Sequence, residues 1–139
     1  RNLRAMQEAD VDMSIRLYDG RVALAEIKSD WWLGVSGKII FEILRLNHTC
    51  TTDSSCVLGW SARSPAKWLL FYAPQVKAIY KISFDDYRSA MQRFTQEEEP
   101  HKHIVTVRTD RIKTTLNLLI PEKYMAEGLK IYRIRSNNT

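Results

Sequence analysis

Apolar and polar residues alternate in several short stretches of this chain, and this pattern predicts more strand than helix. The expected strands form a hairpin at 11–28 and lie near 68–73, 77–82, 103–109, 115–120 and 129–135. The last of them is expected at a sheet edge. The apolar segment 39–46 fits a strand or a helix, and the segments 49–56 and 95–102 are expected to be loops.

One long amphipathic helix is expected from Ser83 to about Phe94. Ser83 and Asp86 have the spacing of a capping box. Apolar side chains recur along one stripe of this helix, at Phe84, Tyr87, Met91 and Phe94. A short helix is expected over 121–127, because proline opens that segment and Gly128 follows it. We expect one strand-rich α/β domain over residues 1–139.

The hairpin at 11–28 allows two registers, because the Asp-Gly pair at 19–20 can form two kinds of turn. A two-residue turn would place Asp12 opposite Ile27. A three-residue turn, with the glycine in the left-handed conformation, would place Asp12 opposite Glu26. Only the second register separates an apolar row that contains Ile27 from a polar row that contains Glu26 and Lys28. We therefore expect the carboxylates of Asp12 and Glu26 to lie within about 5 Å of each other.

Two carboxylates beside a lysine have the chemistry that metal-assisted phosphodiester hydrolysis needs. Asp12 and Glu26 could bind Mg²⁺ or Mn²⁺, which lowers the pKa of a bound water. Lys28 could position or deprotonate that water, or stabilise the charge that develops on the phosphate. The alternative is an ordinary structural Glu–Lys pair, with Asp12 as a solvated neighbour.

These residues resemble the D…(D/E)xK signature of the restriction-endonuclease-like, or PD-(D/E)xK, nuclease superfamily. Three longer stretches are similar to segments of small nuclease-like proteins of phages and mobile elements: "EIKSDWWLGVSGKIIFEI", "LGWSARSPAKWLLFYAP" and "KTTLNLLIP". The similarity covers roughly residues 10–121. It implies an α/β fold in which a few helices flank a mixed central sheet, and a metal-dependent endonuclease that acts on DNA or RNA, with DNA favoured.

The resemblance also implies roles for individual residues. Asp12, Glu26 and the carbonyl of Ile27 would be ligands of Mg²⁺ or Mn²⁺, and Lys28 would be the catalytic lysine. Glu42 would be a second acid, which either contacts the ligands of the metal ion or binds a second metal ion.

The chain departs from the family pattern at three places. Lys38 stands where the family has an asparagine, and Lys67 stands where it has an aspartate. The helix that the family places before the Asp-bearing strand is absent or truncated. These departures favour the alternative function, a non-catalytic module of the same fold that binds nucleic acid or supports an assembly.

The net charge of the chain also favours a nucleic-acid partner. The chain has 21 Lys+Arg against 16 Asp+Glu, a net charge of +5, which favours a polyanion such as nucleic acid. The candidate nucleic-acid-binding residues are Lys38, Arg63, Lys67, Arg111 and Lys113. Of the four tryptophans near such cations, Trp60 and Trp68 are expected in the core, and one of Trp31 and Trp32 at the surface.

Cysteine content and hydropathy help to predict the cellular location. Cys50 and Cys56 are too few for a disulfide framework, and no apolar run has the length of a membrane span. We therefore expect a cytoplasmic protein with no membrane partner. A homodimer is natural for a single domain that must cut both strands of a duplex.

Overall fold

The computed structural model describes residues 13–16, 19–47, 55–109 and 113–135. The strands are β1 (Met13–Arg16), β2 (Val22–Ser29), β3 (Lys38–Asn47), β4 (Ser55–Leu58), β5 (Trp68–Ala73), β6 (Ala78–Ser83), β7 (Ile104–Thr109), β8 (Lys113–Pro121) and β9 (Lys130–Arg133). The helices are α2 (Trp60–Arg63) and α3 (Phe84–Glu97), with 3-10 helices η1 (Pro100–His103) and η2 (Glu122–Met125). The result is a strand-rich α/β fold.

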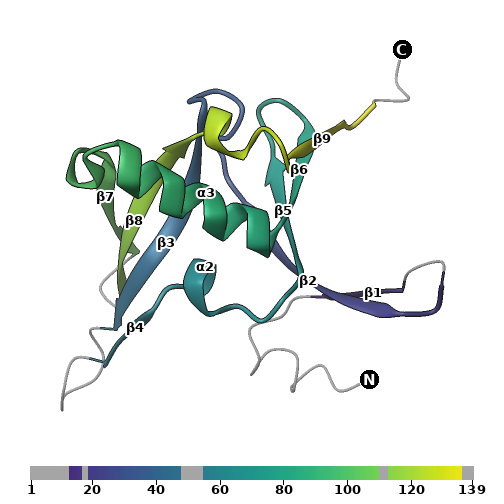
Figure 1. Ribbon diagram of the computed structural model, residues 1–139, viewed down its shortest axis with the longest axis horizontal. Helices are drawn as coiled ribbons and strands as arrows, with labels where there is room; N and C mark the ends of the chain where they lie inside the picture. The colour runs from purple at the N-terminus through teal and green to yellow at the C-terminus, as the bar shows by residue number, and fades with distance from the viewer. Residues whose placement is uncertain (1–12, 17–18, 48–54, 110–112, 136–139) are drawn as a thin grey trace.

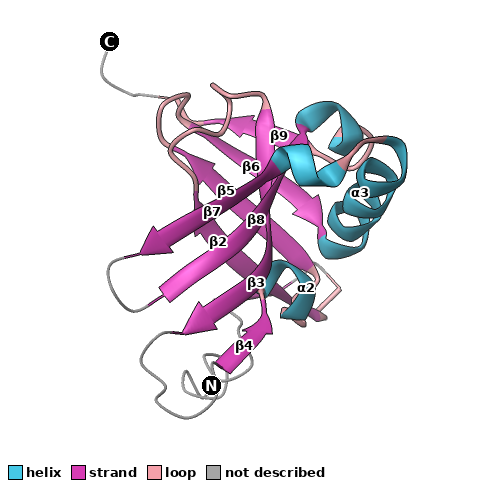
Figure 2. Cartoon of the chain, turned by 90° about the vertical axis from the view of Figure 1, so that its left-hand side faces the viewer, coloured by secondary structure: helices cyan, strands magenta, loops and turns pink. Residues whose placement is uncertain are grey.

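The strands form two sheets. A five-stranded sheet has the order β1-β2-β5-β6-β9, with β2 parallel to β5, and a four-stranded antiparallel sheet has the order β4-β3-β8-β7. In Figure 1 the two sheets lie on either side of the molecule, with α3 crossing in front of them and α2 below it. Figure 2 shows that both helices lie to the same side of the strands. The side chains that are buried on that side of the sheets are therefore those that lie beneath the two helices.

The long helix forms as its local sequence predicts. Ser83 is the N-cap of α3, and its Oγ accepts a hydrogen bond from the N–H of Asp86 at 3.1 Å. The apolar stripe packs into the core through Phe84, Tyr87 and Phe94, all of which are buried. No helix in the described ranges is long and apolar enough to cross a membrane.

Several predicted elements differ in detail. The ambiguous segment 39–46 is a strand, because it lies within β3 and pairs along its length with β8. The expected loop 49–56 was wrong at its end, where β4 begins, and α2 was not predicted. The short helix predicted over 121–127 is instead the 3-10 helix η2, because pairing with β3 extends β8 through Pro121. The edge position of β9 is confirmed.

The hairpin has the predicted register, but the predicted burial of its faces is only partly right. Met13 lies opposite Ala25 as in the three-residue turn, and Gly20 has a φ of +85°. Ala23 and Ala25 of the predicted apolar row are buried, but Ile27 is 42% exposed, and Glu26 of the polar row is 1% exposed. The cause is β5, because the parallel pairing sets Glu26 beside the buried Leu69 and so turns the polar row toward the helices.

Candidate active site

A buried acid and a lysine lie side by side on β2. The Nζ of Lys28 is 2.9 Å from Oε1 of Glu26, and the Ser64 hydroxyl donates to Oε2 of Glu26 at 3.4 Å. The Lys28 side chain is 31% exposed, and its Nζ lies 4.9 Å from the ring centre of Trp60. A buried carboxylate is tolerable only with such partners. Glu26 and Lys28 therefore form a compensated pair with one end open to solvent.

A β-bulge in β3 positions the second acid, Glu42. Glu42 lies opposite Asn117 and Leu44 opposite Leu116, so Ile43 is an extra residue. The N–H of Glu42 donates to the Ser61 hydroxyl at 2.8 Å. The carbonyl of Ile43 accepts from the N–H of residue 59, also at 2.8 Å. Main-chain groups at the bulge therefore hold the segment that contains α2.

The segment around α2 in turn binds the Glu42 carboxylate. The N–H of Trp60 donates to Oε2 of Glu42 at 2.8 Å. Gly59, which precedes it, passes so close to β3 that a Cβ there would lie 2.2 Å from the carbonyl oxygen of Glu42. Only glycine fits this approach. Glu42 is buried, with 5% of its surface exposed.

The helix α3 anchors α2 from the other side. The Arg88 guanidinium donates to the carbonyl of Ser61 at 3.0 Å and to that of Ser64 at 2.7 Å. The hydroxyl of Tyr87 donates to the carbonyl of Ile40 at 2.5 Å and lies 2.8 Å from the Ser61 hydroxyl. Burial raises the pKa of Tyr87 well above its usual 10.0, against the hydrogen bond from Ser61, which lowers it. Tyr87 is therefore a neutral donor.

Arg45 is a member of this cluster that the sequence did not reveal. Glu42 lies opposite Asn117 and Arg45 lies opposite Thr115, so the bulge brings Glu42 and Arg45 to one face although they are three residues apart. An Nη2 of Arg45 is 3.5 Å from Oε2 of Glu42. The usual alternation of a strand would have placed the two side chains on opposite faces, so only the bulge could have revealed Arg45.

Of the predicted catalytic and metal-binding side chains, three lie together, and the fourth lies outside the described residues. Glu26, Lys28 and Glu42 come together around α2, through Ser64, Trp60 and the bulge. Asp12 lies outside the described residues, so its approach to Glu26 stays a prediction. Within the described ranges, no three His, Cys, Asp or Glu side chains gather as a metal-binding group.

The predicted nucleic-acid-binding residues do not form one cluster. Lys38 and Lys113 lie at opposite ends of the β3–β8 pair, where they pair with Pro121 and Asn47. Arg63 and Lys67 are exposed, and the Nζ of Lys67 lies 5.9 Å from the ring centre of Trp68. Arg111 lies outside the described residues.

The tryptophans match the prediction only in part. Trp60 belongs to the buried core, as expected, but Trp68 is only partly buried. Both Trp31 and Trp32 are exposed, at 59% and 62%, where one was expected. The loop between β2 and β3 therefore presents two large aromatic side chains to solvent.

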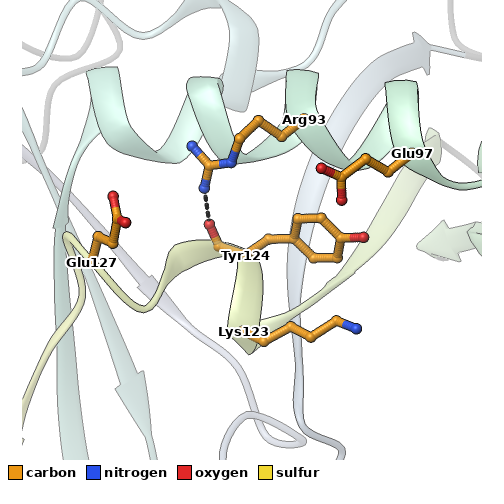
Figure 3. A pocket seen from close by; sticks show the side chains of 5 residues that line it. All are labelled: Arg93, Glu97, Lys123, Tyr124 and Glu127. Atoms are coloured by element: carbon orange, nitrogen blue, oxygen red, sulfur yellow. Dashed lines mark hydrogen bonds between the residues drawn. The ribbon is translucent and has the colours of Figure 1, made fainter.

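Two hollows lie away from the Glu26–Lys28 pair. One, of about 420 Å³, lies between α3 and η2. Figure 3 shows its lining, in which the Arg93 guanidinium donates to the carbonyl of Tyr124. The lining is mixed in charge, with Arg93, Glu97, Lys123, Tyr124 and Glu127. The other, of about 440 Å³, lies over β3, β8 and β7. The first hollow holds none of the predicted site residues.

Comparison of this chain with protein-family models, curated proteins and solved structures gives no match. The fold is a strand-rich α/β arrangement of two sheets and few helices. Its candidate site contains two buried carboxylates, a half-exposed lysine and a helix held by tertiary contacts. The function must be argued from these groups.

Proposed function

We propose that this protein is a metal-dependent nuclease of the restriction-endonuclease-like fold, which hydrolyses phosphodiester bonds of DNA or, as the alternative substrate, RNA. The observation that carries the proposal is the Glu26–Lys28 pair. A carboxylate that is 1% exposed lies 2.9 Å from an ammonium group that reaches solvent. Buried charges contribute little to stability compared with apolar side chains of the same size, so a chemical role is a reason for their presence.

The donor set fits Mg²⁺ or Mn²⁺. Glu26 on β2 and Glu42 on β3 each provide carboxylate oxygens that contact the segment around α2, and these hard cations prefer oxygen ligands. In the proposed site Asp12 and the carbonyl of Ile27 complete the ligands around Glu26. When bound, the cation lowers the pKa of a water and neutralises charge on the phosphate.

Lys28 is the proposed catalytic residue that faces the substrate. Its Nζ lies over the Trp60 ring, 4.9 Å from the ring centre, and its side chain is 31% exposed. From this position it can donate a hydrogen bond to a phosphate oxygen as negative charge develops there. Such an interaction is stronger in the transition state than in the ground state.

The competing function is a non-catalytic module that binds nucleic acid. Both oxygens of Glu26 already have partners, since Lys28 holds one and Ser64 lies 3.4 Å from the other. Lys67 adds an exposed base where the family resemblance leads us to expect an acid. This arrangement favours a closed structural pair. The two functions differ in whether Lys28 affects cleavage.

The test compares Lys28→Met with Lys81→Met, a matched control that removes a partly exposed lysine beside a different tryptophan, Trp68. We expect Lys28→Met to cleave DNA about a hundredfold more slowly with Mg²⁺ or Mn²⁺, the usual effect of losing one such donor. Lys81→Met should retain the wild-type rate constant at saturating DNA. Cleavage is measured per folded molecule, and calorimetry should show that Lys28→Met binds Mn²⁺ within a few-fold of the wild type.

Calorimetry with Asp12→Ala and Glu42→Ala tests the ligand set, and both variants should bind Mn²⁺ more weakly. Wild-type cleavage by Lys28→Met would show that the Glu26–Lys28 pair is structural. If the wild type binds DNA but neither cleaves it nor binds the cation, the non-catalytic function is supported instead.

A further inference from the structure

One face of β3 carries a row of chemically distinct side chains. Lys38, Ile40 and Glu42 are two residues apart and therefore share a face, and the bulge adds Arg45 to it. At about 3.4 Å per residue, this row extends roughly 20 Å along the strand. The row begins and ends with a cation, and Glu42 of the candidate active site lies between them.

An apolar hollow covers the Lys38 end of this row. Its volume is about 440 Å³, and its lining comes mainly from apolar side chains of β3, β7 and β8 together with Trp32. The lining includes Trp32, Lys38, Ile40, Val105, Asn117 and Leu119. Asn117 lies opposite Glu42 in the strand register, so the hollow ends beside the candidate active site.

The hollow presents an aromatic ring in a defined way. The carboxylate of Asp30 accepts a hydrogen bond from the N–H of Trp32 at 3.0 Å, which closes a tight turn and orients this tryptophan. Trp32 is 62% exposed although it lines the hollow. The neighbouring Trp31 is equally exposed but does not line the hollow.

The other end of the row has an unsatisfied donor. The Nε of Arg45 is buried and has no hydrogen-bond partner in the part of the chain that the structure describes. Its guanidinium contacts Glu42 only at 3.5 Å. The Arg45 side chain as a whole is 30% exposed, and a phosphate oxygen is the acceptor that a guanidinium fork matches best.

We propose that this face of β3 binds single-stranded nucleic acid, with an unpaired base against Trp32 in the hollow and a phosphate on Arg45. Single strands expose the faces of their bases to aromatic rings, whereas a duplex presents mainly its charged backbone. An apolar hollow that lies between two cations therefore matches a single strand and does not match a duplex. The proposal rests on the proposed function, since it names the substrate class of the Glu42 site.

The test measures binding of a fluorescein-labelled oligothymidylate and of a blunt duplex of equal length, by anisotropy in a metal-free buffer with chelator. We expect the wild type to prefer the single strand. Trp32→Ala should weaken single-strand binding about tenfold, in line with the loss of one stacked base. The matched control, Trp31→Ala, removes an equally exposed ring from the same loop and should change the affinity less than twofold.

A second pair of variants tests the phosphate contact. Arg45→Met should weaken binding and reduce the slope of log affinity against log salt by about one, because one phosphate contact is lost. Arg21→Met is the control, since it removes an exposed arginine from the hairpin turn, where it pairs with Asp19. It should leave the slope unchanged.

Three results would overturn the inference: equal effects of Trp31→Ala and Trp32→Ala, preference for the duplex, or a dimer that only Trp32→Ala dissociates while the oligonucleotide stays unbound. The last would assign the hollow to a second copy of the chain. Because these assays contain no metal, binding in the expected pattern without cleavage under any condition would support the single-strand site and reject the nuclease. Cleavage without that pattern would reject the single-strand site alone.

Discussion

The helices α3 and α2 lie on the same side of the strands but cover different chemistry. Under α3 the buried side chains are mainly aromatic and aliphatic, with Phe94 packed against His103 and Tyr124. Around α2 the buried residues include the polar or charged set Glu26, Glu42, Ser61 and Ser64. Apolar burial stabilises a fold by about 25 cal/mol per Å², whereas buried charges contribute little or cost free energy. The first region therefore stabilises the fold, and the second holds the residues on which the proposed function rests.

The two helices also differ in what makes them helical. α3 has 14 residues, an N-cap and an amphipathic stripe, so its own sequence favours it. α2 has four residues and no side-chain cap, and isolated helices so short are unstable. Contacts with Arg88, Glu42 and Ile43 hold it in place. Substitutions should therefore affect stability strongly under α3 and affect function strongly around α2.

The largest loss of stability is expected for Phe94→Ala. Phe94 is fully buried, and its removal leaves a cavity, so the free energy of unfolding should fall by about 3–5 kcal/mol. Urea denaturation measures this loss, with Met91→Ala on the same helix as a half-buried control. The remaining folded protein should keep its nucleic-acid affinity. A loss below about 1 kcal/mol would contradict the distinction between the two regions.

A smaller loss is expected for Lys28→Met, because it leaves the buried carboxylate of Glu26 without its ion-pair partner. Breaking a buried pair costs about 3 kcal/mol or more, and partial exposure of Lys28 reduces the expected loss to about 2 kcal/mol. Adding Glu26→Gln to the same chain should restore most of it. A double-mutant cycle in urea checks this coupling, and strictly additive losses would show that the two groups act independently.

Tyr87→Phe should cost about 1–2 kcal/mol at neutral pH, since it removes the hydroxyl that donates to the Ile40 carbonyl. Burial raises the pKa of Tyr87 above its usual 10.0, so above that pH the unfolded tyrosine loses a proton that the folded one keeps. The wild type should therefore lose stability as pH rises past about 10, whereas below that pH the contribution of Tyr87 is fully present and does not depend on pH. Tyr87→Phe has no ionisable hydroxyl at this position, so it lacks this pH-dependent loss of stability. The urea midpoints of the two proteins should therefore converge at high pH. A difference that stays constant with pH would contradict the raised pKa of Tyr87.

The smallest effect is expected for Ser83→Ala at the N-cap of α3. One side-chain hydrogen bond to the N–H of Asp86 is lost, which typically costs about 1 kcal/mol. Ser83→Asp should restore most of the stability, because aspartate caps equally well. Any change in metal or oligonucleotide binding by the folded variants would show that α3 transmits strain to α2.

The parts of the fold that were predictable depend on neighbours in sequence. Gly20 and the alternating residues around it predict the hairpin register, because a slip by one residue would mix the two rows. Ser83 predicts the start of α3 through a contact only three residues away. The Glu26–Lys28 pair was predictable in the same way, since alternate residues of a strand share a face.

Other features depend on residues far apart in sequence. The bulge at Ile43 exists where β3 meets β8, and it brings Arg45 beside Glu42 against the normal alternation of a strand. α2 is helical because groups on β3 and α3 bind its main chain, and nothing within its four residues predicts that.

Short-range patterns in this chain were enough to select the strand register, the long helix and the acid–lysine pair, because each depends on spacings of two to four residues. They could not decide which of Glu26 and Ile27 is buried. Glu26 is hidden and Ile27 exposed because β5 pairs with β2 in parallel and turns the polar row toward the helices. Burial is a property of what packs against a strand, and that partner comes from forty residues further along the chain.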